Sequence, residues 1–220
     1  MANESIEWTN CWREKADRDT KRILLVGDSI IWGAKSFVSK ALPDHLAMTA
    51  IATSKGVDDP YYVAEIDLLC KQEGYAYEAV YFNNGLHTHG QSPKEYACNY
   101  RTALNTLREQ IPNAVWILGL STPIAINPSS GADHDTPITA QDRLEIKEKN
   151  DLVLAYNQEV RAIADELSLP CFDAYKLLEE KHAWKTDSYH YNEDGRSYLG
   201  RAIADVIQTE CQLRRNEYEA

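Results

Sequence analysis

Short apolar runs alternate along this chain with longer stretches whose apolar residues recur at helical spacing. The runs have the length of buried strands and fall at 23–26, 46–52, 79–82, 114–120 and 170–172. The helical stretches fall at 63–70, 96–107 and 152–167, and a last helix is expected from about Asn192 to the charged tail. Strands that alternate with helices predict an α/β fold with a parallel sheet covered on both faces.

The first apolar run ends abruptly at Gly27-Asp28-Ser29, and a helix-competent stretch begins soon afterwards. A serine at the end of a buried strand lies where an α/β sheet opens into its ligand crevice. Gly-Asp-Ser is also common turn chemistry, so the motif needs a partner elsewhere in the chain. A magnesium-dependent phosphatase of the haloacid-dehalogenase type is excluded, because its second aspartate is replaced by Trp32 and no Asp-x-Asp strand precedes Asp28.

That partner is found near the other end of the chain, in Asp187-Ser188-Tyr189-His190. This segment follows the last strand and precedes the last helix, so it emerges at the carboxyl edge of the sheet, as Ser29 does. His190 is placed to act as general base for Ser29, and Asp187 to orient the imidazole. The alternative is a surface Asp–His pair near a helix N-terminus.

The bulk properties narrow the classes of function. The 220 residues fit one domain, with 1–21 as a lead-in and 22–220 as the domain itself. A net charge of −11 with no basic run argues against nucleic acid or a membrane surface as partner. The loop at 122–141 contains Asp133-His134-Asp135, which we interpret as a solvated polar loop and not as a metal site.

The cysteines and the N-terminal residues indicate in which cellular compartment the protein is expected. The five cysteines are odd in number and widely spaced, with no C-x-x-C pair, which argues against a disulfide framework or a zinc knuckle. The first twenty residues lack the apolar stretch of a signal peptide, and no run has membrane-spanning length. A cytoplasmic location is therefore the expectation, although a signal removed beforehand would leave no trace.

Gly27-Asp28-Ser29 near the start and Asp187-x-x-His190 near the end resemble the first and last blocks of the SGNH (GDSL-type) hydrolases, over about residues 22–210. The resemblance implies a flavodoxin-like, three-layer α/β/α fold with about five parallel strands. It also implies ester hydrolysis through an acyl-serine, without metal or cofactor. The family's second block is a glycine whose backbone N–H helps to bind the oxyanion, beside that of the serine, and Gly56 stands at the matching place.

The third block departs from the family pattern of Gly-x-Asn-Asp. The chain reads Asn83-Asn84-Gly85-Leu86-His87, so His87 stands where the asparagine is expected. An imidazole N–H can donate to an oxyanion, so His87 is the first candidate for this role by register. Asn83 or Asn84 is the alternative, with Asn84 preferred of the two.

The sequence thus predicts a metal-free serine esterase acting on small acyl esters, most simply O-acetyl groups on a carbohydrate, as a divergent branch of the family. Its partner would be a small-molecule or oligosaccharide ester, and the oligomeric state is open. A lysophospholipase or thioesterase is the enzymatic alternative, although two Met and three Phe offer a poor lining for a long acyl chain. A non-catalytic glycan-binding domain on the same fold is the other.

Overall fold

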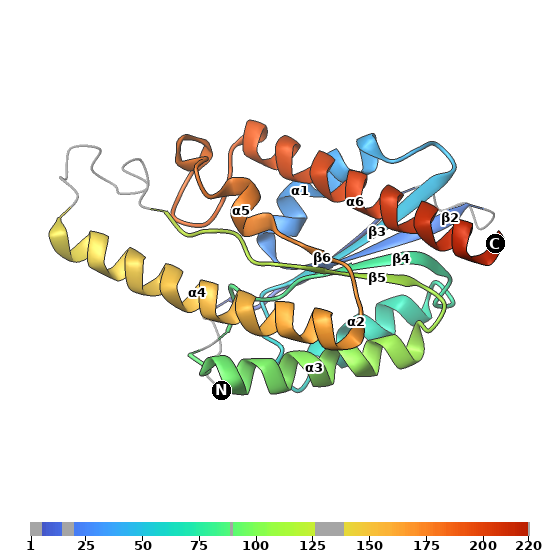
Figure 1. Cartoon of the computed structure of the whole chain (residues 1–220), viewed down its shortest axis with the longest axis horizontal. Helices are drawn as coiled ribbons and strands as arrows, with labels where there is room; N and C mark the ends of the chain where they lie inside the picture. The colour runs from blue at the N-terminus through green and yellow to red at the C-terminus, as the bar shows by residue number, and fades with distance from the viewer. Residues whose placement is uncertain (1–5, 15–19, 89, 126–138, 220) are drawn as a thin grey trace.

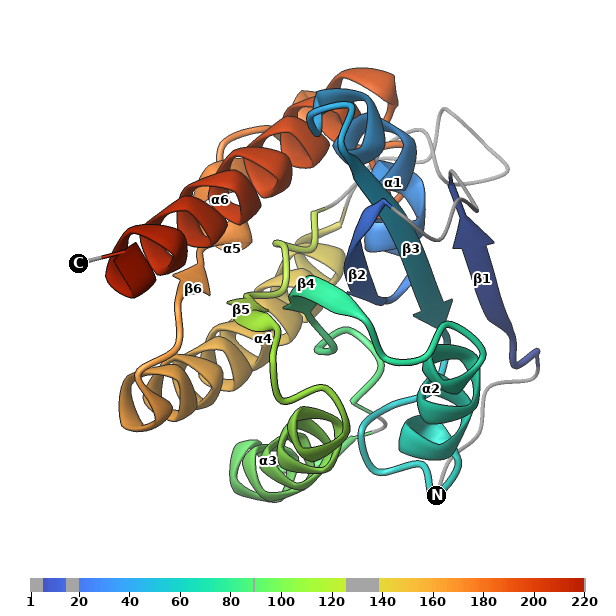
Figure 2. The same cartoon turned by 90° about the vertical axis from the view of Figure 1, so that its right-hand side faces the viewer.

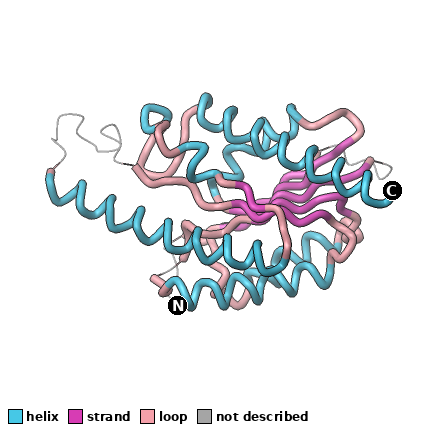
Figure 3. The backbone as a smooth tube through the Cα atoms, in the orientation of Figure 1, coloured by secondary structure: helices cyan, strands magenta, loops and turns pink. Residues whose placement is uncertain are grey.

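The computed structural model describes residues 6–14, 20–88, 90–125 and 139–219. A six-stranded sheet lies between two layers of helices (Figures 1 and 3). The strands are β1 (Thr9–Arg13), β2 (Lys21–Gly27), β3 (Leu46–Thr53), β4 (Tyr77–Phe82), β5 (Val115–Gly119) and β6 (Cys171–Phe172). The helices are α1 (Ser29–Ala41), α2 (Tyr62–Lys71), α3 (Pro93–Gln110), α4 (Ala140–Leu167), α5 (Ala174–Leu178) and α6 (Glu193–Glu219), with a short 3₁₀ turn, η1, at His182–Trp184.

The five predicted strands all form, and they are parallel to one another in the order β3-β2-β4-β5-β6. This is the flavodoxin order, in which the strand order reverses beside β2. Ligands of such sheets bind outside the carboxyl ends of the strands at that reversal. The carboxyl end of β2 leads into Ser29, so the fold places this serine in the expected crevice.

The sheet has one strand more than the sequence indicates. Thr9–Arg13 pairs antiparallel with β3 at the edge of the sheet, so part of the segment predicted as a lead-in belongs to the sheet (Figure 2). This strand has no continuous apolar run, because an edge strand buries only one side and its residues here are partly exposed.

Alternation of side chains along the strands divides the core into two clusters, one on each face of the sheet. On β2, Leu24 and Val26 pack against the layer formed by α2, α3 and α4, whereas Ile23 and Leu25 pack against α1, α5 and α6. On α4 the buried stripe runs through Val153, and Leu152, which the sequence places on it, is 38% exposed.

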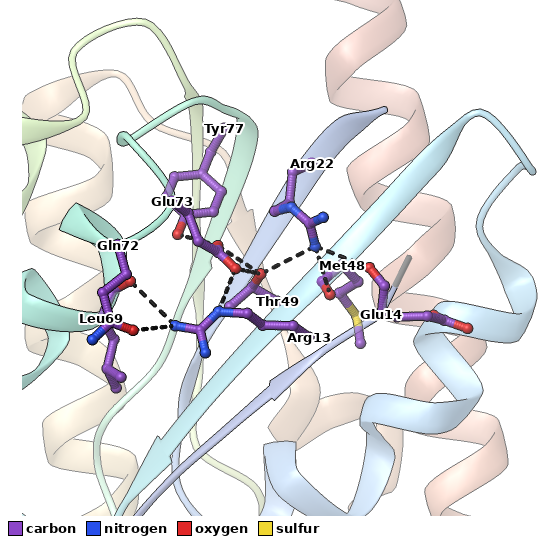
Figure 4. Close-up of polar contacts among 9 residues, drawn as sticks. All are labelled: Arg13, Glu14, Arg22, Met48, Thr49, Leu69, Gln72, Glu73 and Tyr77. Atoms are coloured by element: carbon purple, nitrogen blue, oxygen red, sulfur yellow. Dashed lines mark hydrogen bonds and ion pairs between the residues drawn. The ribbon is translucent and has the colours of Figure 1, made fainter. Parts of the chain in front are cut away.

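A polar cluster centred on Glu73, in the turn after α2, joins the strands β1, β3 and β4 (Figure 4). The Glu73 carboxylate accepts hydrogen bonds from Thr49 Oγ1 (2.7 Å) and Tyr77 Oη (2.6 Å) and pairs with Arg13 Nε (2.6 Å). Because Arg13 lies on β1 and Thr49 on β3, the cluster attaches the antiparallel edge strand to the parallel sheet. Burial raises the pKa of the Tyr77 phenol, with the neighbouring Cys70 and Glu73 adding to the effect.

No helix in the described part of the chain is both long enough and apolar enough to cross a membrane.

Candidate active site

Ser29 lies at a tight turn from strand to helix. Asp28 caps α1, accepting a hydrogen bond from Ile30 N–H at Oδ1 (2.9 Å), and Ser29 is the first helical residue. The turn requires glycine at position 27, since a Cβ there would lie 2.4 Å from Ile31 Cγ1. Asp28 and Ile30 are buried while Ser29 is partly exposed, so the turn presents the serine hydroxyl at the surface.

The structure brings Ser29, His190 and Asp187 into one hydrogen-bonded row. His190 Nε2 lies 2.8 Å from Ser29 Oγ, and His190 Nδ1 lies 2.6 Å from Asp187 Oδ2. The side chains of His190 and Asp187 are 45% and 40% exposed, so a substrate can reach the row. With Nδ1–H donated to Asp187, Nε2 is free to accept the Ser29 proton.

Asp187 is held in place by the backbone of its own loop. Its Oδ1 accepts hydrogen bonds from the Tyr189 and His190 N–H groups, both at 2.7 Å. Partial burial alone would raise the pKa of Asp187, but the hydrogen bonds from His190 and Tyr189 outweigh it and hold the pKa below its ordinary value. The carboxylate therefore stays ionised and fixed toward the imidazole.

A buried lysine ties this loop to the segment that follows β5. Lys185 Nζ donates to Tyr189 O and to Pro123 O, both at 2.7 Å, and lies 3.7 Å from the centre of the Tyr191 ring. Burial lowers the pKa of Lys185 to about 7, against the opposing effect of Asp187. The sequence gives no sign of this role, because lysine is rarely buried and nothing near it marks it as an exception.

The candidate oxyanion donors lie on the loops after β3 and β4. Gly56 is buried in the first loop, and His87 is partly exposed in the second. Asn84 is fully buried, and its Nδ2 donates to Lys55 O at 2.9 Å, so its amide points into the protein. Asn83 is also buried and its Nδ2 donates to Gly119 O at 2.8 Å, which joins the ends of β4 and β5.

A further amide that the sequence does not reveal supports the end of β5. Asn157 on α4 accepts the Ser121 N–H (2.8 Å) and donates to Ser121 O (3.0 Å). Ser121 in turn lies against Gly85, where a Cβ would approach its Oγ to 1.9 Å. The backbone at Gly85, after β4, is thus packed tightly against the Ser121 side chain, after β5.

Among the residues that the structure describes, no three His, Cys, Asp or Glu side chains are grouped as a metal site. Asp133-His134-Asp135 lies outside the described residues.

The doubly wound sheet and the Ser–His–Asp row at its carboxyl edge have the arrangement of a serine hydrolase. The chain belongs to the GDSL-like lipase/acylhydrolase family, whose model matches residues 78–203, more than half of its length. It is therefore a hydrolase of the esterase and acylhydrolase class. The matched segment contains His87, Asp187 and His190 and begins after Ser29.

Solved structures share the fold at low sequence identity. The chain is similar to the inhibitor-bound aryl esterase of M. smegmatis, with a TM-score of 0.67 and 14% identity over 87% of this chain and 100% of that one. It is similar to a carbohydrate acetylesterase family member from Sinorhizobium meliloti, with a TM-score of 0.64 and 15% identity over 88% and 100%. The acetyl xylan esterase AlAXEase gives a TM-score of 0.57 and 18% identity over 84% and 98%. No curated protein matches the chain.

Proposed function

We propose that this protein is a serine esterase that removes small acyl groups, in the first place acetyl, from a carbohydrate through an acyl-serine intermediate. The observation that carries the proposal is the row Ser29–His190–Asp187, with contacts of 2.8 and 2.6 Å. Its members come from opposite ends of the chain and meet at the carboxyl edge of the sheet.

In the proposed reaction, Ser29 Oγ attacks the ester carbonyl while His190 Nε2 takes the hydroxyl proton. Asp187 holds the imidazole and stabilises the imidazolium that forms. The tetrahedral oxyanion is bound by the N–H groups of Ser29 and Gly56 and by His87, and each such donor contributes on the order of 3 kcal/mol. His190 then protonates the departing alcohol. In the second half of the reaction, His190 takes a proton from the water that attacks the acyl-serine and returns it to Ser29 Oγ as the acid leaves.

Two observations support a small acyl group on a sugar. With two Met and three Phe, the chain offers few of the side chains that commonly line a channel for a long acyl group. Similar structures include a carbohydrate acetylesterase family member and an acetyl xylan esterase.

The test is a series of p-nitrophenyl esters from acetate to palmitate, with acetylated oligosaccharides assayed alongside by acetate release. We expect kcat/KM to be highest for acetate and to fall with chain length, and the oligosaccharides to be deacetylated. A maximum at long chains would assign the protein to lysophospholipase or thioesterase chemistry instead. No Ser29-dependent turnover of any ester would favour a binding domain.

A further inference from the structure

One hydrogen bond at the carboxyl edge of the sheet joins two strands that are not neighbours. Asn84, which is 0% exposed, follows β4, and its Nδ2 donates at 2.9 Å to the Lys55 carbonyl, which follows β3. In the sheet β2 lies between β3 and β4. The bond therefore spans the end of the strand that leads into Ser29, and it ties the Lys55–Gly56 peptide to the loop after β4.

The Lys55 carbonyl and the Gly56 N–H belong to the same peptide unit. That unit is planar and, like every peptide bond of the described chain, trans, so its C=O and its N–H point in opposite directions. A donor that fixes the carbonyl therefore also fixes the direction of the N–H. Glycine at position 56 makes such control necessary, because a residue without a Cβ rotates readily into other backbone conformations.

Two neighbouring backbone groups of this loop already have hydrogen-bond partners. Lys55 N–H donates to Thr53 Oγ1 (3.1 Å), and Gly56 O accepts from Asp59 N–H (3.0 Å). The Gly56 N–H, in contrast, makes no hydrogen bond to another described residue. It is the donor that this loop leaves available.

Asn84 is itself rigidly placed. Its backbone carbonyl accepts a hydrogen bond from Tyr96 Oη on α3, and the side chain of the preceding Asn83 is bound to Gly119 O. Because its amide is enclosed and directed at Lys55, Asn84 is not placed to touch a substrate.

We propose that Asn84 is a positioning residue: by holding the Lys55 carbonyl it aims the Gly56 N–H at the developing oxyanion. This inference rests on the proposed esterase function. His87 and Asn84 are then not alternatives for one role. His87 is a candidate donor to the oxyanion, and Asn84 supports the Gly56 donor.

The test compares Asn84→Leu, which keeps the branched shape of the side chain and removes the donor, with the control Asn157→Ala. Asn157 is 4% exposed and also donates its amide to a backbone carbonyl, but at Ser121 and not at the Lys55–Gly56 peptide. We expect Asn84→Leu to lower kcat for p-nitrophenyl acetate by about 10- to 100-fold with KM little changed, because the Gly56 N–H that Asn84 positions binds the oxyanion and not the ground-state ester. Asn157→Ala should lower kcat much less at a comparable loss of thermal stability.

A second measurement reports on the peptide itself. The chain has ten glycines, so ¹⁵N-glycine labelling gives a simple amide spectrum in which Gly56→Ala assigns the Gly56 signal. This signal should move in Asn84→Leu and stay in place in Asn157→Ala. Phosphonylation of Ser29, which mimics the tetrahedral state, should shift it in the wild-type protein but much less in Asn84→Leu.

Unchanged kcat together with an unmoved Gly56 signal in Asn84→Leu would overturn the inference and leave the esterase proposal standing. The absence of any Ser29-dependent hydrolysis in the wild-type protein would instead remove the esterase proposal, and an oxyanion role for Gly56 with it. If Asn84→Leu does not fold, Asn84→Ala is the variant in which the same spectrum decides.

Discussion

Ser29 Oγ and His190 Nε2 lie 2.8 Å apart, although 161 residues separate them in the sequence. Each emerges at the carboxyl edge of the sheet, Ser29 directly after β2 and His190 between η1 and α6. In a parallel sheet all strands end at the same edge, so residues that follow the first and the last parallel strands can meet there. The pair is thus a consequence of the topology, and it is the contact on which the proposed chemistry depends.

A serine-directed fluorophosphonate should attach one label per chain, at Ser29. We expect Ser29 to be the nucleophile, because its hydroxyl is partly exposed and lies at hydrogen-bond distance from an imidazole. Intact-mass and peptide mass spectrometry measure the number and the position of the label. Ser29→Ala should stay unlabelled and keep its thermal unfolding midpoint; a label on another serine in active protein would refute the assignment.

His190→Ala should lower kcat by about 10³-fold or more, and Asp187→Asn by a smaller factor, because the first change removes the base and the second only its orientation and charge partner. In Asp187→Asn the side-chain carbonyl oxygen can still accept the two backbone N–H bonds that close the loop, so the loss should not come from unfolding. Steady-state kinetics on p-nitrophenyl acetate provides both values. Equal activity of His190→Ala and the wild-type protein would exclude the mechanism.

Most of the fold can be predicted from the sequence, because strands that are completely buried appear as unbroken apolar runs. The apolar runs at 46–52 and 79–82 are strands that lie inside the sheet, and their ends are predicted to within two residues. The strand Thr9–Arg13 is not predicted, because an edge strand can be half polar. The burial of Lys185 is not predicted either, because its partners are backbone carbonyls, which no pattern of side chains reveals.

The candidate site also has residues that the sequence predicts and residues that it does not. Ser29, Asp187 and His190 can be predicted from the sequence, since Ser29 comes just after a buried strand, and Asp187 and His190 lie between the last strand and the last helix. The sequence does not predict whether Asn84 or His87 points outward. Both residues lie in an irregular loop, where no periodicity relates a residue's position in the sequence to the direction of its side chain. The Asn84–Lys55 bond depends on the spatial neighbourhood of β3, β2 and β4, which only the three-dimensional structure provides.

His87 is expected to act directly on the oxyanion, in contrast to Asn84. His87→Ala should lower kcat by about 10²-fold with KM little changed, the usual cost of one lost donor. His87→Asn, which restores the residue that the family pattern carries here, should recover part of this loss and serves as the matched variant. A silent His87→Ala would mean that backbone N–H groups alone form the oxyanion site.

Lys185 should make the free energy of unfolding depend on pH. In the folded protein burial lowers its pKa to about 7, whereas the ordinary value of 10.5 applies once the chain is unfolded. Between these values the unfolded state binds more protons than the folded state, so this group makes the protein more stable as the pH rises from about 7 toward 10. Below pH 7 the lysine is charged in both states and contributes no slope.

Lys185→Met removes this titration. Urea unfolding followed by tryptophan fluorescence at pH 6, 7, 8 and 9 should show a wild-type minus variant difference that is flat up to about pH 7. Above pH 7 the difference should shift in favour of the wild-type protein, by at most about 1.4 kcal/mol per pH unit. Lys94→Met is the control, because the Lys94 side chain is 84% exposed and its replacement should add no such slope. Parallel pH profiles for the wild-type protein and Lys185→Met would show that the ammonium is not buried as the structure places it, and that another contact holds the Asp187–His190 loop to the segment after β5.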